Sequence, residues 1–275
     1  RANASIELPR ALASFAVPLC IGIVISKMSS QWLFPVAALC TLAACISAVN
    51  LPRFEVAPKS ASEGVFRRIF EGGAFVMKHN LLRAILFCAI FWNFAFSVLL
   101  VTMLPLIRNV YFVSTGTFGI ALASFGVGAI VGSWISRQHA TRIPPNLILL
   151  FGPGISVLTP IILYFLPSQG PTFPIYLAFF LIGFGPSMWL IAQNSVRQVV
   201  SPDHMLGRVN AVIQTAIYGV RPLAALLAGA LVAATSPQIG VIVVFAGFAL
   251  SFLAAAVSGL RHVRSYAEIR FVEPA

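Results

Sequence analysis

Charged side chains are scarce in this sequence. Asp, Glu, Lys and Arg make up 9% of the 275 residues, while hydrophobic residues make up 59%. An ordinary soluble domain carries about a quarter charged residues. A core of this length does not need so much apolar surface, so the composition excludes an ordinary water-soluble domain and indicates a chain whose solvent is lipid.

Acidic residues are rarer than basic ones, with 7 Asp and Glu against 18 Lys and Arg, which gives a formal net charge of +11. Nucleic-acid binding would require the basic residues to cluster on one soluble face. Here they lie between apolar runs, so no nucleic-acid partner is expected. The four cysteines also lie inside apolar stretches, which excludes a disulfide framework and paired zinc-ligand spacing: Cys20, Cys40, Cys45 and Cys88.

Catalytic motifs are missing as well. The sequence contains no H-E-x-x-H, no G-x-S-x-G and no G-x-x-x-x-G-K-[ST] pattern, and no paired carboxylates stand within its apolar runs. We therefore expect no enzyme activity, no catalytic residues, no metal and no cofactor. The chain begins at Arg1 without a signal peptide before the first apolar run, so we expect it to begin inside a longer polypeptide.

Long apolar runs dominate what is present. A helix needs about 20 apolar residues to cross about 30 Å of hydrocarbon. Eight stretches meet this condition, at residues 11–28, 32–51, 84–107, 117–136, 147–166, 173–194, 209–233 and 239–260. All Lys and Arg except Lys27, Arg108 and Arg221 fall in alternate connections or in the two ends. Because cytoplasmic loops retain positive charge, this pattern predicts eight transmembrane helices with both termini cytoplasmic.

The longest connection, residues 52–80, leaves two spans before it and six after it, in residues 81–260, with a tail at 261–275. Within this connection, residues 63–80 place Val65, Phe66, Ile69, Phe70 and Val76 near one helical face. This pattern predicts a helix lying in the headgroup layer. A solvated linker is the alternative, because two adjacent glycines weaken a helix here.

Two motifs stand where spans meet basic connections. Gly132 and Arg137 have the spacing of the first Gly and the Arg in G-x-x-x-D-R-x-G-R, with Ser136 in place of Asp; an ordinary basic turn is the alternative. The stretch VRQVVSPDHMLGRVNAV carries Gln198, Pro202, Gly207 and Arg208. The first motif resembles a cytoplasmic loop motif of the major facilitator superfamily. The second resembles the Q-x-x-x-P-x-x-x-x-G-R-V stretch of that family's enterobactin-exporter-like branch, the transmembrane secretion effectors.

This resemblance implies an all-α membrane protein, an incomplete major facilitator bundle covering family helices 5–12. Residues 1–51 would then be the last two helices of the N-terminal half, 52–80 the linker between halves, and 81–260 the complete C-terminal half. It further implies a monomeric multi-pass protein of the bacterial inner membrane that exports a siderophore, drug or other secreted metabolite by alternating access. A proton is the expected coupling ion. The six motif residues would act at the cytoplasmic gate.

One cation stands inside a span. Arg221 lies deep in the run 209–233, where an ionisable group is a functional-site hypothesis by default. No Asp or Glu lies within any predicted span, so its counter-charge must come from backbone carbonyls freed by Pro222, from a carboxylate elsewhere, or from an anionic substrate. Gln214, Tyr218 and Arg221 follow i, i+4, i+7 spacing and share one helical face. With Asn93 and Asn194, these residues form the predicted substrate site.

Two other classes of function remain open from the residues alone. A polytopic channel or scaffold would have no transport cycle, and Arg221→Leu would leave it unaffected. A membrane-embedded enzyme would need its catalytic residues in a preceding segment. In the transporter interpretation we expect that the 275 residues alone do not transport, because the pocket needs both halves.

Overall fold

The computed structural model describes residues 33–49, 65–139 and 142–269, and these are helical almost throughout, with no strand. The prediction of an all-α chain is confirmed for this part of the sequence. In chain order the α-helices are α2 (Leu33–Val49), α3 (Val65–Lys78), α4 (Asn80–Leu106), α5 (Gly116–Gln138), α6 (Pro145–Ser156), α7 (Leu158–Tyr164), α8 (Phe173–Val200), α9 (Asp203–Ala234) and α10 (Pro237–Ala256). Short helical turns follow α4 (Ile107–Tyr111) and α10 (Gly259–His262 and Tyr266–Ile269).

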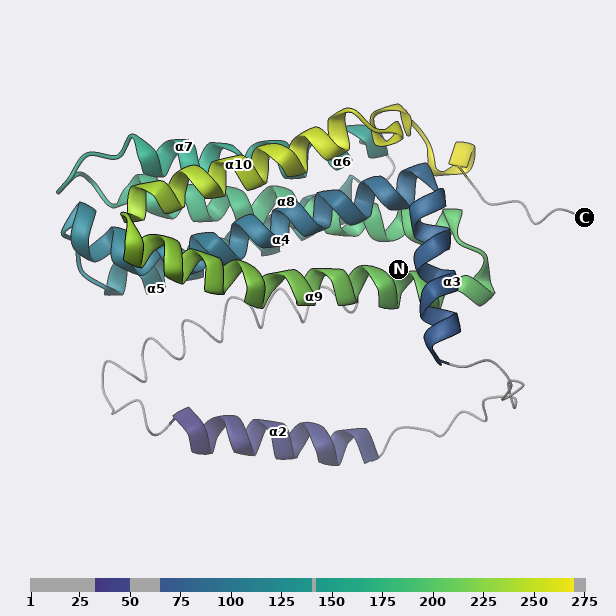
Figure 1. The fold of residues 1–275 in the computed structure, drawn as a ribbon, viewed down its shortest axis with the longest axis horizontal. Helices are drawn as coiled ribbons and strands as arrows, with labels where there is room; N and C mark the ends of the chain where they lie inside the picture. Colours follow the sequence, from purple (N-terminus) through teal and green to yellow (C-terminus); the bar gives the residue numbers. More distant parts are fainter. Residues whose placement is uncertain (1–32, 50–64, 140–141, 270–275) are drawn as a thin grey trace, which may run out of the picture.

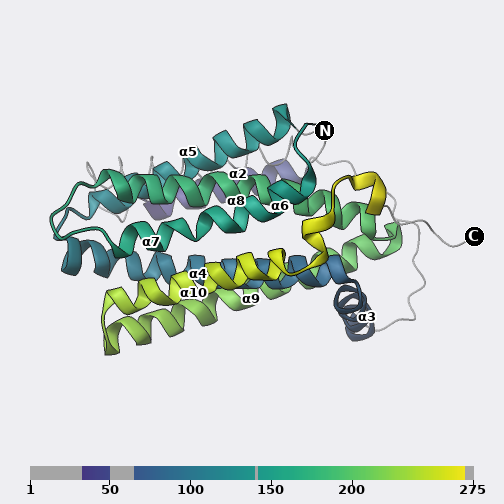
Figure 2. The same cartoon turned by 90° about the horizontal axis from the view of Figure 1, so that it is seen from above.

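Within the described residues, six helical segments are long and apolar enough to cross a membrane. They are Asn80–Tyr111, Gly116–Gln138, Pro145–Tyr164, Phe173–Val200, Asp203–Ala234 and Pro237–Ala256. Figures 1 and 2 show them lying side by side as one bundle. Each of them overlaps one of the six spans predicted after the long connection, with different bounds.

The structure describes only one of the two earlier predicted spans. Residues 11–28 lie outside the described residues. The span predicted at 32–51 corresponds to α2, an apolar helix of 17 residues whose side chains at 34–47 are all exposed. An apolar helix with such exposed side chains needs lipid or further helices around it.

The bundle has two ends, and α3 marks one of them. In Figure 1 α3 runs across the direction of the other helices, beside the start of α4 and the start of α9. We call this the α3 end. The chain returns to it after α5, after α8 and after α10. Among the described Lys and Arg, all lie at the α3 end except Arg108, at the opposite end, and Arg221, within α9.

The predicted span 147–166 is two helices rather than one. The α-helix breaks at Val157, between α6 and α7, and Pro153 and Pro160 flank the break. Pro160 has no N–H to donate to the carbonyl four residues earlier. Two hydroxyl groups near the break donate hydrogen bonds to backbone carbonyls. Ser156 Oγ donates to the Gly152 carbonyl at 3.0 Å, and Thr159 Oγ1 donates to the Ala178 carbonyl at 3.0 Å. Such side-chain bonds make a broken helix tolerable in lipid.

Glycines bring α5 and α8 into backbone contact. A methyl group added at Gly128 or Gly132 of α5 would collide with backbone atoms of Phe180 and Phe184 of α8. Gly183 of α8 in turn meets the Phe125 carbonyl. Small residues at such seams let membrane helices approach closely. Gly132, predicted as part of a gate motif, therefore has a packing role in the C-terminal bundle.

The linker residues 65–78 form a helix, α3, whose inner side packs on α9. A Cβ on Gly72 would lie 3.0 Å from the Arg208 Cβ. Val76 is completely buried, whereas Ile69 and Phe70 are exposed. The predicted single apolar face holds for Ile69, which stands seven positions before Val76 and shares its side of the helix, but it is wrong for Phe70, which points away from the bundle.

Candidate functional site

Arg221 of α9 is held by a residue of α4. Its Nε and Nη2 donate to the Asn93 Oδ1 at 2.9 and 2.7 Å. Asn93 is buried, and its Nδ2 donates to the Ala89 carbonyl at 2.9 Å, which fixes the orientation of the amide. The Arg221 guanidinium carbon also lies 5.5 Å from the ring centroid of Tyr218, one turn earlier on α9. The structure thus brings together three of the five predicted substrate-site residues.

The positive charge of Arg221 is hydrogen-bonded but not neutralised. Asn93 offers a neutral amide oxygen, and within the described residues no carboxylate lies within 4.0 Å of Arg221. The alternative partners, carbonyls freed by Pro222, are not the ones its guanidinium uses, since both of its bonds go to Asn93. A guanidinium that no carboxylate of the described residues neutralises attracts anions.

The surrounding face of α9 is exposed and polar. Asn210, Gln214, Tyr218 and Arg221 are all exposed. Only 11% of the most apolar stretch of α9 is buried, the lowest share among the six spanning segments. A polar face on a spanning helix requires water, a ligand or other protein to contact it, because lipid does not satisfy polar groups. Gln214 shares this face, as predicted, although no bond joins it to Arg221.

Asn194 belongs to a different set of contacts. Its Oδ1 accepts from the Gln193 Nε2 at 2.9 Å and from the Arg197 Nη2, all on α8. These bonds run along a single helix and do not reach the Arg221 group. Asn194 is thus placed by the structure beside a second cation rather than beside the first.

That second cation, Arg197, was predicted to lie in a connection, and this prediction is wrong. The predicted span ended at residue 194, but α8 continues to Val200 and Arg197 is only 7% exposed. Among the described residues it has no carboxylate within 4.0 Å, and its Nε lacks a partner. The i, i+4 spacing of Gln193 and Arg197, with no helix breaker before Pro202, was the signal that the helix continues.

The predicted gate residues have unequal roles at the α3 end. The Arg208 Nη1 lies 2.7 Å from the Glu71 Oε2 of α3. Pro202 is the first residue before α9, and its carbonyl accepts from the Met205 N–H at 2.9 Å. A Cβ on Gly207 would meet nothing within 4 Å, so packing does not require glycine there. Arg137 and Gln198 are exposed.

Two groups near this end have shifted pKa values. Burial lowers the pKa of His79, which lies between α3 and α4. Burial raises the pKa of Tyr266, against the opposing effect of a hydrogen bond with Ser195 of α8. The hydrogen bond between Tyr266 and Ser195 connects the turn after α10 to α8. The lowered pKa of His79 means that its neutral form is favoured.

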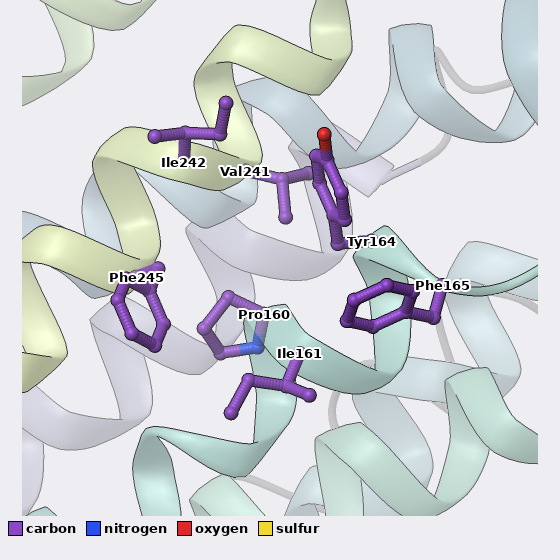
Figure 3. Close-up of a pocket in the computed structure, with 7 residues that line it drawn as sticks. All are labelled: Pro160, Ile161, Tyr164, Phe165, Val241, Ile242 and Phe245. Carbon is purple, nitrogen blue, oxygen red and sulfur yellow. The ribbon is translucent and has the colours of Figure 1, made fainter.

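Two apolar hollows lie away from Arg221. One, of about 420 Å³, is formed by α7 with Phe165 and by α10, and Figure 3 shows its lining side chains. The other, of about 760 Å³, lies among α6, α8 and α10. The first is lined by Pro160, Ile161, Tyr164, Phe165, Val241, Ile242 and Phe245. Neither has charged residues in its lining, so neither has the means to orient a charged substrate.

Comparison with known proteins adds a family assignment. The family model described as Major Facilitator Superfamily matches residues 1–225. The enterobactin exporter EntS of Salmonella paratyphi A (strain ATCC 9150 / SARB42) is 25% identical over 221 residues, covering 76% of this chain and 49% of the relative. EntS of Salmonella choleraesuis (strain SC-B67) is 26% identical over 210 residues, with the same coverage of 76% and 49%. The chain spans about half the length of these curated relatives. No solved structure matches it.

Proposed function

We propose that this chain, which belongs to the Major Facilitator Superfamily, is part of a secondary active transporter that exports a small molecule. The relatives it matches are named as exporters. The observation that carries the proposal is the Arg221 group. A cation that no carboxylate of the described residues neutralises, fixed by Asn93 and Tyr218, stands on the exposed polar face of a spanning helix.

The placement of this group suits alternating access. In this superfamily two six-helix halves rock around a substrate site near the middle of the membrane, between the halves. The segments α4 to α10 supply one half, and the exposed face of α9 is the face it offers to the other. The α3 end is cytoplasmic in this proposal, because the described Lys and Arg gather there.

The substrate in this proposal carries a negative charge or a dense set of acceptor oxygens. Arg221 presents a planar set of donors that suits carboxylate or phenolate oxygens, and the Tyr218 ring offers an aromatic face beside it. Siderophores, drugs and other secreted metabolites include molecules of this kind. Proton coupling is part of the proposal, and its carboxylates come from outside the described spans, since no Asp or Glu but Asp203, the first residue of α9, stands within those spans.

The test is export by the polypeptide as its natural gene encodes it. Cells or vesicles producing it would be assayed for efflux of a panel of siderophores and amphiphilic drugs, with wild type, Arg221→Ala and Arg221→Lys compared. Removing one charge-assisted contact costs about 1.5–3 kcal/mol, so substrate affinity in Arg221→Ala should fall about 10-fold or more. Arg221→Lys should retain part of the affinity, because it keeps the charge without the planar donor set.

Arg108→Ala is the matched control, since it removes an exposed arginine at the other end of the bundle. Equal production of the variants would be checked by immunoblotting of membranes. Efflux of every transported compound at the wild-type rate by Arg221→Ala would refute the proposed site. Absence of efflux for the whole panel by the wild-type protein would favour the channel or scaffold alternative.

A further inference from the structure

The linker helix α3 has apolar side chains on two opposite sides. On the side toward the bundle, Gly72 approaches Arg208 and Val76 is completely buried. On the side away from it, Phe70 and Met77, which stand seven positions apart, are exposed to 78% and 44% of their surface. A helix that packs on protein with one side normally turns polar residues outward on the other. The outward apolar side chains of α3 therefore need a partner.

The contact with α9 fixes the position of α3. Glu71 pairs with Arg208 of α9 at 2.7 Å and with Arg67 of α3 at 3.0 Å. Because Gly72 has no side chain, the α3 backbone reaches the Cβ of Arg208. Helix α3 is thus held at the side of α9 by an ion pair and by close packing, and its outward face cannot turn inward without breaking both.

The depth of α3 follows from where it meets α9. Arg208 is the sixth residue of α9, so the contact lies about 7.5 Å along the helix from its first residue, at 1.5 Å per residue. Helix α3 also leads, through His79, into α4, a spanning helix that starts at Asn80. An element that runs across the bundle at the ends of its spanning helices lies at the surface of the bilayer, in its plane (Figure 1).

The charges on α3 also match this surface. Arg67 and Lys78 are exposed and stand eleven positions apart, which is close to three helical turns, so they share one side of α3 next to the apolar face. Interfacial helices combine an apolar face with Lys and Arg on the polar face, and the cations are attracted to anionic lipid headgroups.

We propose that the outward face of α3, formed by Phe70 and Met77, inserts into the headgroup layer of the bilayer, and that Arg67 and Lys78 contact anionic phospholipids there. The Glu71–Arg208 pair transmits the position of this lipid-bound helix to α9, the helix that carries Arg221. The surface of the membrane thereby becomes a partner of the linker between the two halves.

Site-directed spin labelling tests this proposal. A variant with Cys20, Cys40, Cys45 and Cys88 replaced by serine would carry one new cysteine, Phe70→Cys or Met77→Cys, in the polypeptide as its natural gene encodes it. The labelled protein would be placed in vesicles of phosphatidylethanolamine and phosphatidylglycerol. Collisions of the label with oxygen, which concentrates in lipid, would be compared with collisions with a water-soluble nickel complex. Asp203→Cys, at the exposed start of α9, is the water-exposed reference.

The expected result is an excess of oxygen over nickel collisions at both α3 positions and the reverse at residue 203. High accessibility to both reagents at residue 70 would mean that α3 faces water, and low accessibility to both would mean that another protein segment covers it. Either result would overturn the proposal. Replacing phosphatidylglycerol by phosphatidylcholine should reduce the oxygen excess at residue 70 in the wild-type background, and Arg67→Gln with Lys78→Gln should abolish that dependence. An oxygen excess that does not depend on lipid charge would refute the role given to anionic phospholipids.

Discussion

Replacing Asn93 by Asp should neutralise the positive charge of Arg221 and thereby weaken the binding of an anionic substrate. Asn93 Oδ1 already accepts two hydrogen bonds from the guanidinium, at 2.9 and 2.7 Å. The aspartate side chain has nearly the same shape as that of asparagine, so the carboxylate would take the place of the amide and form an ion pair with Arg221. The substitution therefore changes the charge that a substrate meets while keeping the shape of the side chain, and it removes the hydrogen bond from Nδ2 to the Ala89 carbonyl.

The size of the effect depends on how much water the site holds. Two unit charges about 4 Å apart attract each other by about 1 kcal/mol in bulk water and by about 4 kcal/mol at the effective dielectric constant of 20 that suits sites near a protein surface. Since about 1.4 kcal/mol is a factor of ten, an anionic substrate that competes with the carboxylate should lose between about fivefold and about a thousandfold in affinity. Thermal stability should change little, because the ion pair with Arg221 offsets the lost hydrogen bond to the Ala89 carbonyl.

The assay is binding or efflux of the transported compound as a function of its concentration, with unfolding in detergent measured on the same preparations. Gln214→Glu is the matched control, since it adds the same charge on the face of α9 that carries Arg221, seven residues from Arg221 and about 10.5 Å along the axis. Its effect should be much smaller than that of Asn93→Asp. Equal losses in the two variants would show that only the overall charge of the face matters, and full activity of Asn93→Asp would refute the role given to Arg221.

The other predictions concern packing and the α3 end. Gly132→Leu should destabilise the bundle by about 1–3 kcal/mol or prevent folding, because the new Cβ would collide with α8. Gly119→Leu is the control and should leave the melting temperature unchanged, because nothing lies within 4 Å of a Cβ there. Similar melting temperatures for the two variants would contradict the close α5–α8 contact. Glu71→Gln should cost only about 0.2–1 kcal/mol, since the pair with Arg208 is partly exposed, and the loss should shrink in high salt; a salt-independent loss would point to packing instead. The folded-state pKa of His79 is lowered by burial, so its neutral form contributes stability that is present above its unfolded pKa of about 6.5 and is lost as the pH falls through the folded pKa. Melting temperatures measured between about pH 7 and pH 5 should therefore fall less in His79→Gln than in wild type, and parallel curves would refute this assignment.

Local patterns in the sequence were enough to predict the six spanning helices of the described residues and one face of the site. Hydrophobic run length determines which segments can satisfy their backbone in lipid, and this condition does not depend on neighbouring helices. For the same reason the shared face of Gln214, Tyr218 and Arg221 could be predicted, since helical spacing alone places them together. The end of α8 was misplaced because hydropathy stops at the first polar residues, while helical hydrogen bonding continues through Arg197 to Val200.

The partners of these residues depended on the tertiary structure. Asn93 stands 128 positions from Arg221, and Glu71 stands 137 positions from Arg208. No local pattern encodes such distances, because they depend on which helices become neighbours when the bundle packs. The sequence determined that a cation would lie in the membrane and that a basic motif would open α9. Only the packing of α4 and α3 against α9 decided that the Asn93 amide would hold Arg221 and that the Glu71 carboxylate would hold Arg208.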